Sequence, residues 1–273
     1  MKEGINFEQE AQHKQTSESL RNKVDTIINL FIKDFSIDGK EKLISTINEN
    51  PEEKFIVTAS HLSNLDAPSA IKSLGDILDM QIAVDGSLFS LAPHALMFNI
   101  AGKENFSPLE YKKVNGKMSG SFNPENFERI AEHMEEGKTP WIAIHPFTIT
   151  GVMQDPRIGP VYLAHKTGAK IIPTALEVHG NSINLEGPIE MAKGIAGRIS
   201  GDSKAIFHIG EVIDLPEMDV NIIETVINKR ANHEQVSPEE KELFKETTNK
   251  LREEADKVAK IISEMLPQEQ RGK

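Results

Sequence analysis

Apolar residues occur along this chain in two patterns, as short uninterrupted runs and as runs spaced three or four residues apart. The short runs are rich in β-branched residues and lie next to turn signals, which is typical of buried strands. The spaced runs predict helices that bury one face. The strands expected from the short runs are 55–57, 81–84, 141–144, 171–178, 181–185 and 205–212.

The helices are expected between these strands and at both ends of the chain. Ser237-Pro238-Glu239-Glu240 has the form of a capping box with proline at the first helical position, and Ser107-Pro108-Leu109-Glu110 has the same form. Between 193 and 204, three basic residues alternate with glycines, which predicts a loop. The expected helices are about 17–35, a short one around 43–47, one near 66–74, part of 87–100, one from 108, 124–136, 159–168 and 238–265.

Helices that alternate with short apolar strands define an α/β fold class, with a central mixed, largely parallel sheet flanked by helices. We expect an N-terminal helical extension over 1–48, an α/β domain over 49–273, and a long helix at the C-terminus. The apolar face of the first helix favours packing on the core or a partner subunit. Leu30, Phe31 and Ile32 widen this face, which leaves peripheral membrane contact open as an alternative.

Composition narrows the function classes. The net charge of −11 argues against nucleic-acid binding, which requires a basic surface. No cysteine is present, so neither disulfides nor a thiolate metal site can form, and a cytoplasmic location fits. No apolar run approaches the roughly 18 residues of a membrane span, and no histidine or carboxylate spacing suits a metal. We therefore expect a protein without a metal or resident cofactor, cytoplasmic or peripheral to the inner face of a membrane.

The most informative polar stretch follows the first expected strand. His61 leaves the end of that strand, and Asp66 lies five residues later at the start of a helix. This spacing lets the carboxylate bind one imidazole nitrogen, which would orient the other nitrogen as a general base. The alternative is a loop hydrogen bond in which Asp66 or Asn64 only caps the helix. The spacing alone does not decide between the two.

The stretch His61-Leu62-Ser63-Asn64-Leu65-Asp66 resembles the first signature of the glycerolipid acyltransferases, which include glycerol-3-phosphate and lysophosphatidic acid acyltransferases. Residues 159–176, a helix followed by a strand centred on Ile172-Pro173, resemble another landmark of that family. The resemblance covers about 54–178. It implies that His61 deprotonates an acceptor hydroxyl, that Asp66 orients it, and that Ser63 lies at the substrate.

Two other family signatures are altered. Where the family has Phe-Pro-Glu-Gly-Thr-Arg-Ser, this chain keeps Pro146 but has Phe147 in place of the glutamate and Thr150 in place of the arginine. The hydroxyls of Thr148 and Thr150 could bind a phosphate or an oxyanion, although more weakly than arginine. The second signature, an arginine after a Gly-Ala-Phe-Phe-type strand, is missing, and Lys112 or Lys113 could replace that arginine.

These features favour an acyltransferase that moves a fatty acyl group from coenzyme A or acyl carrier protein to a hydroxyl of glycerol-3-phosphate or a lysophospholipid. The altered signature leaves open a catalytically impaired lipid-binding protein, and hydrolysis of the thioester is a third alternative. His145 also follows a strand, where it is either a structural loop residue or a second substrate contact. The acyl donor, the chain length and the oligomeric state do not follow from the sequence.

Overall fold

The computed structural model describes residues 15–86, 102–110, 113–114, 117–118, 123–146, 153–180 and 188–271. A seven-stranded mixed sheet forms the centre, in the order β1-β9-β8-β2-β7-β3-β4. All neighbouring strands are parallel except β8 and β9. The α/β class with a largely parallel sheet is therefore confirmed. The strands of this sheet are β1 Asp34–Asp38, β2 Phe55–Ser60, β3 Met80–Asp85, β4 Phe106–Leu109, β7 Thr139–His145, β8 Lys170–His179 and β9 Lys204–Ile209.

Helices cover both faces of the sheet, because the central strands are buried on both sides. Along β2, Phe55 and Val57 belong to one apolar cluster and Ile56 to the other. The first cluster includes buried side chains of α1, α2 and α3, and the second those of α5, α6, α8 and α9. The bounds are α1 Glu18–Phe31, α2 Lys40–Glu49, α3 Asp66–Leu74, α5 Pro124–Glu135, α6 Gly159–Thr167, α8 Asn221–Ala231 and α9 Pro238–Glu264.

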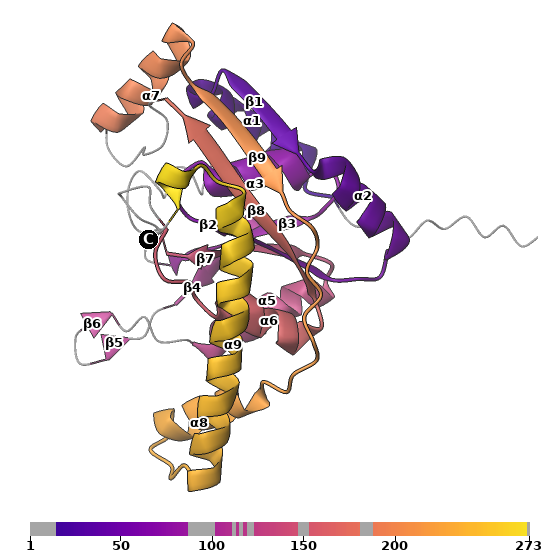
Figure 1. The fold of residues 1–273 in the computed structure, drawn as a ribbon, viewed down its shortest axis with the longest axis vertical. Coiled ribbons are helices and arrows are strands. Elements are labelled where there is room, and N and C mark those ends of the chain that lie inside the picture. The colour runs from indigo at the N-terminus through magenta and orange to yellow at the C-terminus, as the bar shows by residue number, and fades with distance from the viewer. Residues whose placement is uncertain are drawn as a thin grey trace, which may run out of the picture.

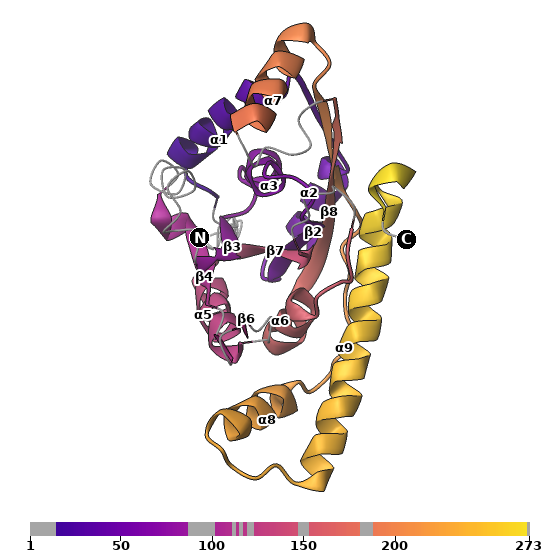
Figure 2. The same ribbon diagram turned by 90° about the vertical axis from the view of Figure 1, so that its left-hand side faces the viewer.

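The long C-terminal helix α9 is confirmed, and so is its capping box between Ser237 and Glu240. It runs along one face of the sheet, in yellow in Figure 1, and Figure 2 shows it on the opposite side of the molecule from α1. Helix α7 (Pro188–Ser200) packs against α1 at one end of the molecule. Smaller elements are the hairpin of β5 (Lys113–Val114) and β6 (Lys117–Met118) and the 3-10 turns Lys103–Asn105 and Gln268–Gln270.

The N-terminal segment contains the expected helices and, between them, a strand that was not expected. Helices α1 and α2 form as predicted, but β1 lies between them and pairs with β9 in the main sheet. The helical periodicity that placed Phe35 in the first helix is therefore wrong beyond Phe31. The backbone turns extended at Ile32, and the Lys33 amide donates to the Ser203 carbonyl at 3.1 Å. Tertiary pairing thus decides this boundary rather than local propensity.

Two further predictions are wrong, and two others lie outside the described residues. The apparent capping box at Ser107 belongs to strand β4, where Pro108 is tolerated because β4 lies at the edge of the sheet. The glycine-containing basic stretch from 193 to 200 is helical, as part of α7. The expected strand 181–185 and the expected helix within 87–100 lie outside the described residues.

Candidate active site

His61 and Asp66 are positioned by the junction between β2 and α3. Strand β2 is buried along its whole length and ends at Ser60, and α3 begins at Asp66. The loop between them is closed by two reciprocal bonds: the Ser63 amide donates to Asp66 Oδ2 at 2.7 Å, and the Asp66 amide donates to the Ser63 carbonyl at 3.1 Å. These bonds fix the carboxylate in the first turn of the helix.

The two side chains meet as the spacing suggested. His61 Nδ1 lies 3.1 Å from Asp66 Oδ2. The imidazole is 29% exposed whereas the carboxylate is only 3% exposed. The pKa of Asp66 is raised above its ordinary value because burial outweighs the hydrogen bond from His61 and the backbone amides of Ser63 and Leu62, which act in the opposite direction. The carboxylate is therefore a fixed internal acceptor, and the imidazole is the partner that reaches the surface.

Trp141 makes a second contact with the imidazole that the sequence did not suggest. It lies on β7, opposite Val57 of β2. The His61 and Trp141 rings are 5.7 Å apart at 85°, an edge-to-face arrangement. The indole Nε1 is buried and has no hydrogen-bond partner within the described residues. Packing against Trp141 thus restricts the rotation of the His61 ring. The two residues are close in space because β7 pairs with β2.

Such a pair can perform acid–base chemistry. When Nδ1–H donates to a carboxylate, the proton is held on Nδ1 and the lone pair lies on Nε2. An imidazole oriented in this way can accept a proton from a hydroxyl and return it to a leaving group. Strands β7 and β3 end at the same edge of the sheet as β2, at His145 and Asp85. Ligands of parallel sheets gather at this edge.

His145 has a structural environment. His145 is 2% exposed, and its Nδ1 lies 2.9 Å from Ser60 Oγ. The bond crosses the irregularity in the β2–β7 register, where Ser60 pairs with His145. Burial lowers the pKa of His145 to about 4. The side chain is thus neutral at pH 7 and joins the two strand ends, which favours the structural alternative over a substrate contact.

The remaining predicted site residues are placed as follows. The Ser63 hydroxyl is buried and accepts a hydrogen bond from the Leu65 amide at 3.1 Å, so it is engaged within the loop. Pro146 directly follows β7 and is half-buried. Lys113 begins β5, and its side chain is outside the described structure, as are Lys112, Thr148 and Thr150. The structure therefore brings together His61, Asp66 and Ser63.

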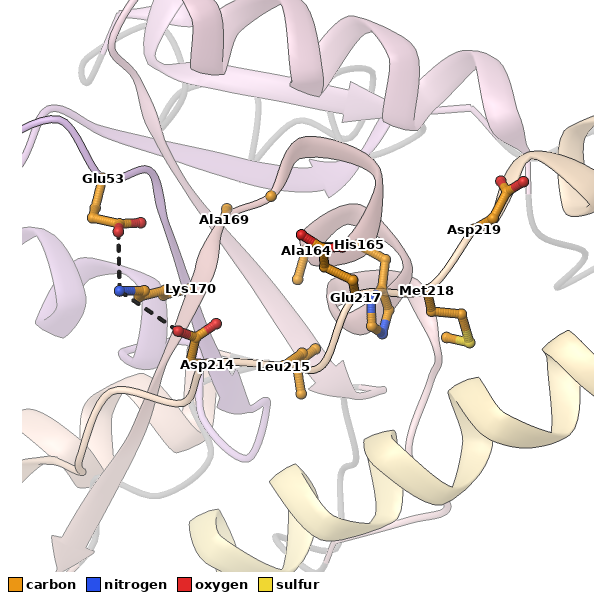
Figure 3. Close-up of a pocket in the computed structure, with 11 residues that line it drawn as sticks. Glu53, Ala164, His165, Ala169, Lys170, Asp214, Leu215, Glu217, Met218 and Asp219 are labelled. Carbon is orange, nitrogen blue, oxygen red and sulfur yellow. Dashed lines mark ion pairs between the residues drawn. The ribbon is translucent and has the colours of Figure 1, made fainter.

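A pocket that the sequence did not suggest lies at the opposite edge of the sheet (Figure 3). It has a volume of about 670 Å³ and is lined by Glu53, which precedes β2, and Lys170, the first residue of β8. Lys170 forms ion pairs with Glu53 at 3.0 Å and with Asp214 at 3.7 Å. These residues lie at the amino ends of the strands, so this pocket is separate from the His61 site.

Two properties of the described residues bear on binding partners. No group of three or more histidine and carboxylate side chains among them is arranged to hold a metal ion. None of their helices is both long enough and apolar enough to cross a bilayer.

The fold and the site define an α/β protein with a histidine–carboxylate pair at the carboxyl edge of its sheet. No protein-family model matches the sequence, and no curated protein matches it. Among solved structures the chain is similar to the 1-acyl-sn-glycerophosphate (LPA) acyltransferase PlsC from Thermotoga maritima. The identity is 14% and the TM-score 0.46, over 88% of this chain and 78% of that one. At this level the similarity says nothing about substrates or catalytic residues.

Proposed function

We propose that this protein is an acyltransferase that moves a fatty acyl group from an acyl thioester to a hydroxyl of glycerol-3-phosphate or a lysophospholipid. The observation that carries the proposal is the pairing of an accessible imidazole with a buried carboxylate, His61 Nδ1 to Asp66 Oδ2 at 3.1 Å, at the carboxyl end of β2. The His-x-x-x-x-Asp resemblance supports the assignment of the acyl-transfer class.

The chemistry follows from that geometry. His61 Nε2 takes the proton of the acceptor hydroxyl, and the oxygen attacks the thioester carbonyl. A carbon–oxygen bond forms, the carbon–sulfur bond breaks, and the proton passes from His61 to the departing thiolate. Asp66 holds the tautomer that keeps the proton on Nδ1 and stabilises the imidazolium. A base of this kind contributes roughly 10²–10⁴ in rate, and no acyl intermediate on the protein is needed.

The test measures thiol release from an acyl-coenzyme A by purified protein, with and without glycerol-3-phosphate or lysophosphatidic acid. His61→Ala is expected to lower the acceptor-dependent rate by about 10²–10⁴-fold. His179→Ala is a matched control, because this half-exposed histidine lies at the end of β8 and pairs with Glu177 rather than with Asp66. Equal rates for wild type and His61→Ala would exclude His61 as the base.

The second candidate is a lipid-binding protein on the same fold without turnover. The observation that favours it is the presence of Phe147 and Thr150 where the resembled family carries glutamate and arginine. Neutral hydroxyls bind phosphate more weakly than the two-pronged arginine contact. This candidate predicts saturable binding of lysolipid or acyl chains, measured by calorimetry, with no product for any combination of donor and acceptor. Thiol release at a rate independent of acceptor would instead indicate hydrolysis.

A further inference from the structure

Helix α7 carries an exposed apolar surface. Ile195 and Ile199 lie one turn apart on this helix and are 39% and 77% exposed. Gly194 and Gly197, on the other side of the helix, are buried. Since glycine has no side chain, this side can pack closely against α1, with which α7 is in contact. The side chains of Ile195 and Ile199 thus point to solvent, whereas an ordinary surface helix buries such residues.

The same end of the molecule gathers basic residues. Lys193 and Arg198 lie on α7, and Lys204 begins β9. Lys33 follows α1 and joins this group, because its amine lies against Gly201 and its backbone amide donates to the Ser203 carbonyl at 3.1 Å. Leu30 of α1 is 43% exposed beside it in the chain. We call the surface made by Leu30, Lys33, Lys193, Ile195, Arg198, Ile199 and Lys204 the α7 surface.

The charge of the α7 surface is opposite to that of the whole chain, whose net charge is −11. Asp34, Glu190 and Asp202 are the acidic residues within 30–34 and 188–204, against four cationic ones. None of these four cations forms an ion pair with a carboxylate of the described residues. Elsewhere many lysines do, for example Lys40 with Asp76 and Lys138 with Asp79. The α7 surface therefore keeps positive charge that ion pairs neutralise at other places.

We propose that the α7 surface docks on a membrane rich in anionic lipid. Two large apolar side chains flanked by Lys and Arg on an exposed helix face fit the boundary between headgroups and acyl chains. Each basic residue near an anionic bilayer adds attraction that salt weakens. A soluble acidic partner would satisfy the charges but would leave Ile199 uncovered, whereas a bilayer satisfies both.

The α7 surface lies in the direction in which β2 ends, on the side of the sheet edge that carries His61. Strands β2 and β8 are parallel, and α7 follows β8. β8 continues past its last pairing with β2, Ala59 with Thr174, to His179, roughly 17 Å further in the direction in which β2 ends. Figures 1 and 2 show α7 at one end of the molecule and the α8–α9 connection at the other. The docking surface stands independently of the proposed chemistry, because none of its residues belongs to the His61 site.

The experiment is co-sedimentation of the full chain with vesicles of phosphatidylcholine alone and of phosphatidylcholine mixed with phosphatidylglycerol. We expect binding to the mixed vesicles that high salt weakens, and little binding to neutral ones. Ile199→Ser and the pair Lys193→Glu with Arg198→Glu should each lower the partition coefficient by about tenfold or more. Ile199→Leu should bind as wild type does, because it keeps a large apolar side chain at this position. The contrast with Ile199→Ser separates a docking role from a folding role.

The matched controls are Leu243→Ser and Lys241→Glu, exposed residues near the start of α9. Figure 1 shows the α8–α9 connection at the opposite end of the molecule from α7. The control variants should leave binding unchanged, and circular dichroism should show all variants folded. The proposal is overturned if wild type does not distinguish the two vesicle types, or if the α7 and α9 variants behave alike. It is also overturned if sedimentation velocity shows a dimer that Ile199→Ser converts to a monomer, since the surface would then join two copies of the chain.

Discussion

Two histidine–carboxylate pairs lie at opposite edges of the same sheet, and their burial is reversed. In the His61–Asp66 pair the imidazole is 29% exposed and the carboxylate 3%. In the pair of His165 Nε2 with Glu254 Oε2, at 2.5 Å, the imidazole is 2% exposed and the carboxylate 12%. The second pair also joins α6 to α9, whereas the first lies within one loop and the helix that follows it.

This reversal separates two roles that the same residue types can play. A buried carboxylate that holds a surface imidazole can present a basic nitrogen to another molecule. A buried imidazole bound to a carboxylate of a neighbouring helix holds two helices together, and its chemistry is turned inward. His165 lines the pocket of about 670 Å³, yet its own side chain is almost fully covered. A hollow beside a histidine is therefore a weaker indication of catalysis than an exposed ring on a fixed acceptor.

The largest expected effect concerns the anchor of the first pair. Asp66→Asn should lower kcat for acyl transfer by about 10²–10⁴-fold, because an amide no longer selects the useful tautomer of His61. KM should change little, since Asp66 is buried away from substrate. Steady-state kinetics with varied acceptor would measure both values.

Asp25→Asn is the matched control for Asp66→Asn, since Asp25 forms its ion pair with Lys72 on the surface between α1 and α3. A kcat for Asp66→Asn within about twofold of wild type would mean that the first pair is only a helix-start contact.

Disrupting the His165–Glu254 pair should lower the stability of the protein and leave its activity unchanged. Glu254→Gln removes a charge-assisted bond to a buried imidazole and should lower the free energy of unfolding by about 1–3 kcal/mol. The kcat of the folded variant should stay at the wild-type value. Urea unfolding followed by circular dichroism gives the stability.

Glu253→Gln, at the exposed neighbouring position on α9, should cost less than about 0.5 kcal/mol. A large loss of kcat in Glu254→Gln with unchanged stability would contradict the division of roles between the two pairs.

The buried histidine His145 should make the free energy of unfolding depend on pH. The pKa of His145 is about 4 in the folded protein because of burial, below its ordinary value of 6.5. Between these two values the unfolded chain binds more protons than the folded one, so stability rises with pH and is lost as pH falls from 6.5 to 4. The loss attributable to His145 across this pH range is about 3 kcal/mol.

His145→Asn keeps an acceptor for Ser60 and should remove this part of the pH dependence, as measured by urea midpoints across the window. His179→Asn, at a half-exposed position, should leave the dependence as it is in wild type. An unchanged pH profile in His145→Asn would show that other groups cause the loss.

The features predicted from the sequence are those encoded by local patterns. The buried strands β2, β3, β7, β8 and β9 were found because their apolar runs do not depend on a partner. The spacing of His61 and Asp66 was sufficient to predict that the two side chains meet, because the loop and the start of α3 bring them together locally. The long C-terminal helix was found from its cap and periodicity.

The features that were missed depend on contacts between distant segments. Strand β1 is short and mostly polar, and it is a strand because it pairs with β9. Pro108 looks like a helix start until the neighbouring β3 is taken into account. The Trp141 contact with His61, which directly follows β2, and the Ser60 bond to His145 both depend on the pairing of β2 with β7. No local pattern contains these pairings.

The place of β1 has a consequence for synthesis on the ribosome. Among the described strands β1 borders only β9, and the paired residues Asp34 and Lys204 are 170 positions apart. At a typical elongation rate of about 5–20 residues per second, β1 waits roughly 10–30 s for its neighbour. During that interval its alternating exposed residues Asp34, Ser36 and Asp38 discourage pairing with a strand of another nascent chain. The polar pattern that made β1 difficult to predict from the sequence thus disfavours its pairing with other chains until β9 is synthesised.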